Sequence, residues 1–262
     1  MGSNDVVQLG VLGTRRGTAF AEAAAQLSEV TVAAFCGRSQ ERLRIIGDFY
    51  PQAKLFTSYG EMLADDEIDA VAVANYADEH VPAVLQALEA GKHVLSEVPA
   101  CVTIAEGVQL ARAVEASGKV YFFGENFCYL AFVQEMRRLY ESGALGELRY
   151  AEGEYVHFAR DVVHKLVDLD IPYHWRLWMY PTFYVTHSIG PILRITGLRP
   201  VAVQAATGLL GMDKEGTLPA QTPAMEMVRL ENGALAKSLH GGPYPREPWQ
   251  PWYSIGGLSL IH

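Results

Sequence analysis

The first 124 residues alternate short apolar runs with helical patterns, and this alternation constrains the fold more than any other feature. Short apolar runs that end near a glycine are typical of strands buried in a parallel sheet. The segments between them predict helices, with Ser39 and Ser58 as N-caps and Gly91 as a terminator. Strands alternating with helices of this length predict βαβ units with right-handed crossovers. The apolar runs are VVQLGVLG at 6–13, VTVAAFCG at 30–37, DAVAVA at 69–74, KHVLS at 92–96 and KVYFFG at 119–124.

The pattern changes after Gly124. A helix is predicted at 131–142, and GELRYAEGEYVHF at 146–158 alternates in the way that an antiparallel strand does. We predict further strands at 201–208, 224–230 and 234–240, a short helix between His187 and Gly197, and a proline-rich loop at 241–251. We therefore expect an α/β Rossmann domain with a doubly wound parallel sheet at 1–125. An α+β domain with a mostly antiparallel sheet is expected at 126–262.

Charge and cysteine content exclude several classes of function. The net charge of −9 argues against nucleic acid and anionic membranes as partners. Three scattered cysteines without a CxxC pair indicate a reducing compartment, and no metal site is suggested. No apolar run is long enough to cross a bilayer, and the N-terminus lacks the features of a signal peptide. We expect a cytoplasmic protein.

The turn after the first strand is a candidate phosphate-binding loop. In a dinucleotide-binding fold this turn carries G-x-G-x-x-G, so that backbone amides approach the pyrophosphate. The sequence here is GVLGTRRGTAF, in which Arg15 occupies the position of the second glycine. The position of the loop between a strand and a helix favours a nucleotide site. The alternative is a glycine turn in a domain that has lost its cofactor. The candidate residues are Gly10, Gly13, Thr14, Arg15 and Arg16.

The end of the second strand bears on the choice between NAD and NADP. An acid at this position binds the ribose 2′-hydroxyl of NAD, but the sequence has Gly37 there, followed by Arg38 and Ser39. A guanidinium and a hydroxyl suit a 2′-phosphate, which favours NADP over NAD. Alternatively, Arg38 lies on the helix surface in solvent.

Other candidate cofactor-binding residues follow the later strands, because doubly wound sheets bind ligands at the carboxyl ends of their strands. The alternative roles are helix capping, solvent contact and anchoring of loops. These candidates are Asn75, Tyr76 and His80 after the fourth strand, Glu97, Val98 and Pro99 after the fifth, and Glu125 and Asn126 after the sixth.

Four segments give the chain a resemblance to the Gfo/Idh/MocA family of sugar oxidoreductases over nearly its whole length: GVLGTRRG, AVAVANYADEH, ALEAGKHVLSEVPA and ESGALGELRYAEGEYVH. Within that family, SEVPA, GENFCY, AEGEYVH and YVTHSIGPI are most similar to the branch that contains the NAD-dependent glycosidases of family 109. The family usually has a lysine where this chain has Val98. The resemblance to the glycosidase branch implies that Tyr155 and His187 handle the proton instead. His157 points to the same face as Tyr155 and is a candidate to replace or assist it.

These observations predict an NAD(P)-dependent oxidoreductase acting on a sugar, a sugar derivative or a polyol. The alternative is a glycosidase that uses tightly bound NAD transiently, and a second alternative is a catalytically silent dinucleotide-binding protein. The resemblance also implies a longer chain, because the family continues beyond WYSIGGLSLIH with more sheet and a closing helix. A sheet shortened at the C-terminus would expose an edge and an apolar face. We therefore expect a homo-oligomer, a dimer or larger, through the sheet of the second domain.

Overall fold

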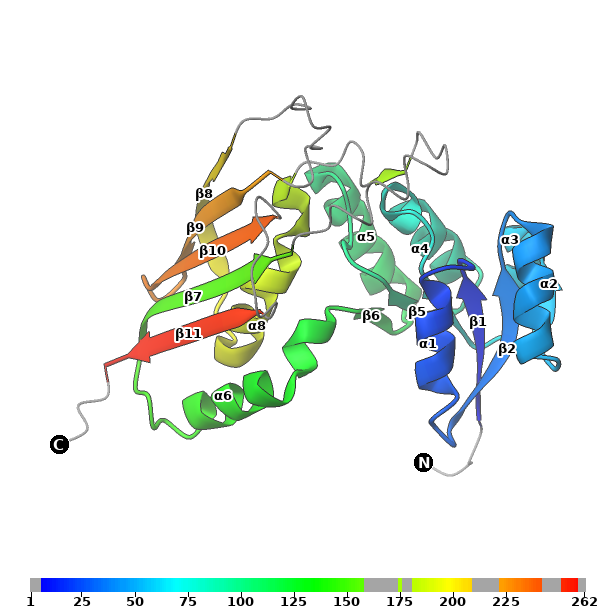
Figure 1. Cartoon of the computed structure of the whole chain (residues 1–262), viewed down its shortest axis with the longest axis horizontal. Helices are drawn as coiled ribbons and strands as arrows, with labels where there is room; N and C mark the ends of the chain where they lie inside the picture. The colour runs from blue at the N-terminus through cyan, green and yellow to red at the C-terminus, as the bar shows by residue number, and fades with distance from the viewer. Residues whose placement is uncertain (1–5, 158–173, 176–180, 209–221, 242–250, 259–262) are drawn as a thin grey trace. The chain divides into compact units, whose positions relative to one another are not determined.

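The computed structural model describes residues 6–157, 174–175, 181–208, 222–241 and 251–258 (Figure 1). The chain forms two compact units, Met1–Gly124 and Glu125–His262. Glu125 thus belongs to the second unit, whereas the sequence-based boundary placed it in the first. Within the described ranges, no helix combines the length and the hydropathy needed to cross a membrane.

The first unit is a six-stranded parallel sheet in the order β3-β2-β1-β4-β5-β6, which confirms the predicted Rossmann fold (Figure 1). The strand order reverses between β1 and β4, which makes their carboxyl ends the switch point at which such sheets bind ligands. Its strands are β1 (Val7–Leu12), β2 (Val30–Cys36), β3 (Lys54–Phe56), β4 (Ala70–Val73), β5 (His93–Ser96) and β6 (Tyr121–Phe123). Its helices are α1 (Gly17–Ala24), α2 (Gln40–Phe49), α3 (Tyr59–Leu63), η1 (Ala77–Glu79), α4 (His80–Glu89) and α5 (Ile104–Ser117).

Local signals in the sequence set the ends of these helices. The Ser39 hydroxyl accepts a hydrogen bond from the Arg42 amide and so caps α2, as predicted. Thr103 and Glu106 form a capping box at the start of α5. Gly91, after α4, has a φ of +74°. This left-handed conformation costs glycine little and ends the helix.

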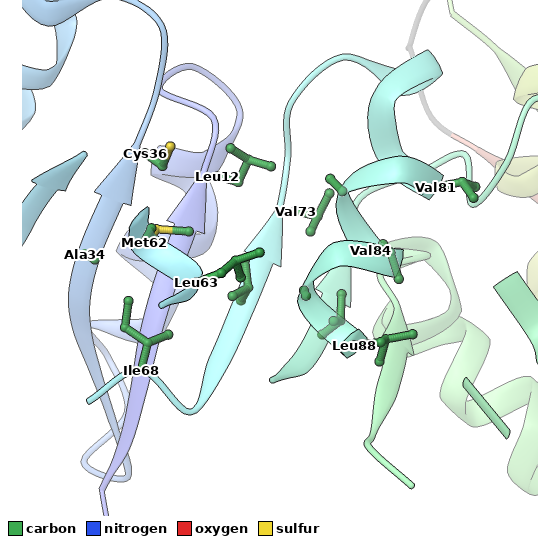
Figure 2. Packing of buried hydrophobic residues seen from close by; sticks show 14 of the residues in the cluster. Leu12, Ala34, Cys36, Met62, Leu63, Ile68, Val73, Val81, Val84 and Leu88 are labelled. Atoms are coloured by element: carbon green, nitrogen blue, oxygen red, sulfur yellow. The ribbon is translucent and has the colours of Figure 1, made fainter. Parts of the chain in front are cut away.

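Apolar cores cover both faces of the parallel sheet, which explains why its strands are continuously apolar. On one face, side chains of the strands pack against α3 and α4; Figure 2 shows Met62 and Leu63 near Leu12, and Val84 near Val73. On the other face, Val11 and Phe35 pack with residues of α1 and α2. Successive strand residues therefore alternate between two dry layers rather than between core and solvent.

The second unit contains a five-stranded sheet in the order β11-β7-β10-β9-β8. Among its described strands only β7 and β10 pair in parallel, so the predicted, mostly antiparallel sheet is confirmed. Its strands are β7 (Leu148–Val156), β8 (Pro200–Thr207), β9 (Ala224–Leu230), β10 (Leu235–Gly241) and β11 (Trp252–Gly257). The helical segments among its described residues are η2 (Asn126–Tyr129), α6 (Ala131–Glu141), η4 (Pro181–Tyr184) and α8 (Thr186–Thr196).

One face of this sheet packs against α8. Ile192 of α8 lies in a buried cluster with Ala151 of β7 and Val228 of β9. The helix ends at Gly197, whose φ of +69° is again left-handed. The predicted loop at 241–251 lies, apart from its two end residues, outside the described residues.

Candidate functional site

Two glycines fix the shape of the turn between β1 and α1. Gly13 has a φ of +112°, and a Cβ atom at this position would overlap the carbonyl oxygen of Ala74. A Cβ atom on Gly17 would lie 2.6 Å from Cγ1 of Val11, so this glycine allows α1 to pack closely on β1. These are the tight-turn and helix-packing roles of the first and last glycines of a dinucleotide loop. Thr14, Arg15 and Arg16 lie between them, whereas Gly10 lies within β1 itself.

At the end of β2, a side chain in place of Gly37 would require the Thr14 side chain to move. A Cβ atom on Gly37 would overlap the Thr14 side chain. The next residue, Arg38, forms an ion pair with Glu79, and the hydrogen bond between them is the main reason that the pKa of Arg38 is raised. The Ser39 hydroxyl is the α2 cap. The Arg38 guanidinium and the Ser39 hydroxyl, the two groups that favoured a 2′-phosphate, therefore already have partners within the protein.

At the end of β4, His80 anchors a neighbouring turn. It is 1% exposed, and its Nδ1 lies 2.8 Å from the carbonyl oxygen of Pro99. Burial lowers the pKa of this imidazole, which keeps it neutral. Asn75 donates from Nδ2 to Glu79 over 3.2 Å, and its Oδ1 is buried with no partner among the described residues. Tyr76 immediately precedes η1.

At the end of β5, Glu97 connects the turn to the glycine loop. Its Oε1 accepts a hydrogen bond of 2.9 Å from Nε of Arg16. Its Oε2 is buried and has no hydrogen-bond partner in the described part of the chain. Val98 is buried, and the peptide bond between it and Pro99 is cis. The edge of the parallel sheet thus presents two buried acceptor atoms, on Asn75 and Glu97, that suit hydroxyl or amide donors of a ligand.

In the second unit, Glu125 and His187 form a buried pair. Nδ1 of His187 lies 2.7 Å from Oε1 of Glu125, and the two side chains are 6% and 5% exposed. Because an ionised carboxylate only accepts hydrogen bonds, we assign the Nδ1 hydrogen to this bond. The basic nitrogen of His187 is then Nε2. Glu125, which we predicted to bind a cofactor, is paired with this imidazole through Oε1, and the neighbouring Asn126 begins η2.

Tyr155 lies against this pair. Its ring centroid is 4.6 Å from that of His187, and its hydroxyl oxygen is 3.1 Å from Nδ1 of His157. Phe127 stacks on His187 at 4.5 Å and meets Tyr155 edge-on at 5.3 Å. The structure therefore brings the three predicted catalytic residues, His187, Tyr155 and His157, into one cluster.

The start of α8 is held tightly against the sheet, and this fixes His187. A Cβ atom on Gly153 of β7 would overlap the carbonyl oxygen of Ser188. The hydroxyl oxygens of Ser188 and Ser238 lie 2.7 Å apart, and the Tyr253 hydroxyl donates to the carbonyl oxygen of His187. Burial raises the pKa of Tyr253, so that it remains a donor.

The sequence analysis missed two buried polar residues on the same face of the sheet, Glu226 of β9 and His240 of β10. Their signal is the alternation of AMEMVRL, in which Glu226 shares a face with the apolar Val228 and Leu230. A charged residue on the buried side of a strand is unusual enough to mark a candidate site.

Comparison with known proteins agrees with this geometry. Residues 7–125 match the model of the Gfo/Idh/MocA oxidoreductase family, described as having an NAD-binding Rossmann fold. This match covers less than half of the chain; together with the relatives described next, it supports the predicted resemblance to the family and the predicted NAD- or NADP-binding domain.

The relatives found by sequence include members of glycosyl hydrolase family 109. One from Shewanella putrefaciens is 28% identical over 202 residues, covering 72% of this chain and 44% of the relative. Another, from Phocaeicola vulgatus, is 26% identical, covering 97% of this chain and 55% of the relative. The chain thus spans about half the length of these relatives.

Solved structures with the same fold include dehydrogenases. An oxidoreductase domain protein from Kribbella flavida has a TM-score of 0.83 at 21% identity, covering 97% of this chain and 72% of that one. The scyllo-inositol dehydrogenase of Lactobacillus casei, solved with NAD(H) and scyllo-inositol, has a TM-score of 0.79 at 17% identity, covering 97% of this chain and 74% of that one. At these identities the likeness establishes the fold.

Proposed function

We propose that this chain is an NAD- or NADP-dependent oxidoreductase that acts on a hydroxyl group of a sugar, a sugar derivative or a polyol. The observation that carries the proposal is the Glu125–His187 pair beside Tyr155, in a chain whose first unit has a dinucleotide-binding fold. The inositol dehydrogenase of Lactobacillus casei, solved with a polyol, supports the class of substrate.

The dinucleotide would be held at the carboxyl edge of the parallel sheet. The turn shaped by Gly13 and Gly17 suits a pyrophosphate, and the buried acceptors on Asn75 and Glu97 suit its ribose hydroxyls or carboxamide. When bound, the nicotinamide supplies a hydride acceptor and donor.

The acid–base work falls to the cluster of the second unit. His187 removes the proton of the substrate hydroxyl through Nε2, because its Nδ1 is bonded to Glu125. The carboxylate of Glu125 stabilises the imidazolium that forms. The Tyr155 hydroxyl and Nδ1 of His157 share a second proton through their hydrogen bond. No carboxylate pair is needed for this chemistry.

A second candidate function is a glycosidase that oxidises its sugar transiently and later returns the hydride from the dinucleotide to the sugar. Two observations favour it, namely the relatives of family 109 and the absence of a lysine at Val98. In this reaction the transient ketone acidifies the neighbouring C–H. The cluster around Tyr155 would then remove that proton, and the glycosidic oxygen would leave with a proton. Water would add to the resulting double bond, and the hydride would return to the ketone carbon.

The two functions differ in their use of the dinucleotide. We would incubate the protein with NAD or NADP and a panel of sugars, polyols and aryl glycosides, and record reduced dinucleotide at 340 nm together with released aglycone. The first function predicts reduced dinucleotide in proportion to substrate. The glycosidase function predicts that aglycone is released without accumulation of reduced dinucleotide.

The variant His187→Ala tests the assigned base. Removing a general base lowers turnover about 10²–10⁴-fold. Affinity for the dinucleotide, measured by titration calorimetry, should stay within twofold. Loss of both activity and binding would contradict the assignment, as would full activity.

We also propose that the chain forms a homodimer through the outer face of its second sheet. Alternation along β9, β10 and β11 places Met225, Met227, Leu235 and Trp252 on the face opposite α8, each at least 41% exposed. The charged residues Arg229, Lys237 and Glu152 share this face with them. Exposed apolar groups bordered by polar residues are typical of an interface between subunits. A cytoplasmic location is proposed from the three free thiols, and the negative charge supports small molecules rather than nucleic acid or membranes as partners.

A further inference from the structure

Glu226 and His240 form a second buried histidine–carboxylate pair in the second unit. Their exposed fractions are 4% and 0%, and Oε2 of Glu226 lies 3.3 Å from Nδ1 of His240. The angles are not those of a hydrogen bond, and in the described part of the chain neither side chain has another hydrogen-bond partner. Buried polar groups without partners cost free energy and call for an explanation.

The register of the sheet places this pair beside Tyr155. His240 of β10 is aligned with Tyr155 of the parallel strand β7, and Glu226 of β9 is aligned with Ser238. Because aligned residues of neighbouring strands point to the same face, His240 and Tyr155 are side-by-side neighbours on the face that packs against α8. Glu226 lies one strand further away. The imidazole of His240 is therefore closer to the phenol of Tyr155 than the carboxylate of Glu226 is.

We propose that Glu226 and His240 are positioning residues for Tyr155. The carboxylate of Glu226 orients the imidazole of His240, and this imidazole, when it carries a proton, favours the phenolate form of Tyr155. The inference rests on the proposed function, in which Tyr155 takes and returns a proton. It explains why two ionisable side chains are retained in a dry layer, where apolar residues of the same size would pack without cost.

Other ionisable groups surround Tyr155, and any measurement must separate their effects. His157 follows the end of its strand, and His187 faces it from α8. Glu125 is the N-cap of η2, and Cys128 lies within η2. Tyr253 of β11 also interacts electrostatically with Tyr155. Burial raises the pKa of Cys128 to about 12, so this thiol stays neutral. Each of these groups remains in place when only Glu226 or His240 is changed.

The experiment is a pH titration of Tyr155 by fluorine NMR on the full chain labelled with 3-fluorotyrosine. The chain has 13 tyrosines, and Tyr155→Phe identifies the resonance. In His240→Asn, loss of the imidazole should raise the midpoint of the Tyr155 titration by about one pH unit. Glu226→Gln, which keeps size and shape, should raise it in the same direction. Glu231→Gln is the control, since Glu231 pairs with Arg199 in the turn after β9.

A midpoint unchanged in Glu226→Gln overturns the proposal, even if His240→Asn does not fold. A Tyr155 resonance that fails to titrate before the wild-type protein unfolds also overturns it, because the phenolate is then not accessible. If a substrate is turned over, both variants should lower kcat about tenfold and leave the KM for the dinucleotide unchanged. If no substrate is turned over, that result counts against the proposed function and not against this inference, because the titration of Tyr155 needs no substrate.

Discussion

Among single residues, the buried His80 leads to a prediction about how the stability of the protein depends on pH. Burial lowers the pKa of this imidazole, so the folded protein binds its proton more weakly than the unfolded chain does. The contribution of His80 to stability is therefore present above about pH 6.5, the value of an unperturbed histidine, and is lost as the pH falls below it.

Urea unfolding between pH 7 and pH 5 checks this prediction. The wild-type protein should lose stability toward pH 5. His80→Asn should be less stable at pH 7, because the bond to Pro99 is lost, but should depend less on pH. Equal slopes for the two proteins would show that His80 is not the titrating group.

Single residues also show where sequence reasoning stops. Tyr155 and His187 were identified by family resemblance, and the structure places their rings 4.6 Å apart. Glu125 was assigned to the cofactor because it follows a strand of the first domain. Its partner is a histidine 62 positions away, which spacing along the chain cannot reveal.

Among elements, the position of α8 depends on a single glycine. A Cβ atom at residue 153 would overlap the carbonyl oxygen of Ser188 and push the start of the helix away from β7. Gly153→Ala should therefore lower the free energy of unfolding by about 1–3 kcal/mol and reduce turnover through the displaced His187.

The matched control is Gly143→Ala, because a Cβ atom there meets no other atom within 4 Å and its φ of +77° tests backbone strain alone. Chemical denaturation and turnover of both variants would separate contact from strain. Stability and activity in Gly153→Ala equal to those of the wild type would contradict the close packing of α8 on β7.

Elements with strong local signals were predicted well. Ser39 and Ser58 cap α2 and α3 as predicted, and AMEMVRL, predicted as a strand, alternates cleanly as β9. By contrast, β3 is only three residues long and β11 follows a proline-rich segment, so neither carries a periodic pattern. The pairing of β7 in parallel with β10 depends on contacts far apart in the sequence.

For the whole molecule, we predict from the outer face of the second sheet that the protein is a homodimer. Light scattering after size-exclusion chromatography should give twice the chain mass of 28.8 kDa. Met227→Lys would bury a charge in the interface and should give a monomer. Arg229→Lys, on the same strand but conserving charge, should remain dimeric. A wild-type protein that elutes at the mass of one chain would contradict the proposed dimer.

The central claim is that this chain binds a nicotinamide dinucleotide. The most direct test is to denature freshly purified protein, identify released dinucleotide by mass spectrometry, and titrate any empty protein with NAD(H) and NADP(H) by calorimetry. We predict about one dinucleotide per chain, either released or bound in the titration. NAD(H) that is retained through purification would favour the glycosidase, and reversible binding would favour the dehydrogenase. If neither dinucleotide is released or bound, the central claim is wrong and the chain is not an oxidoreductase.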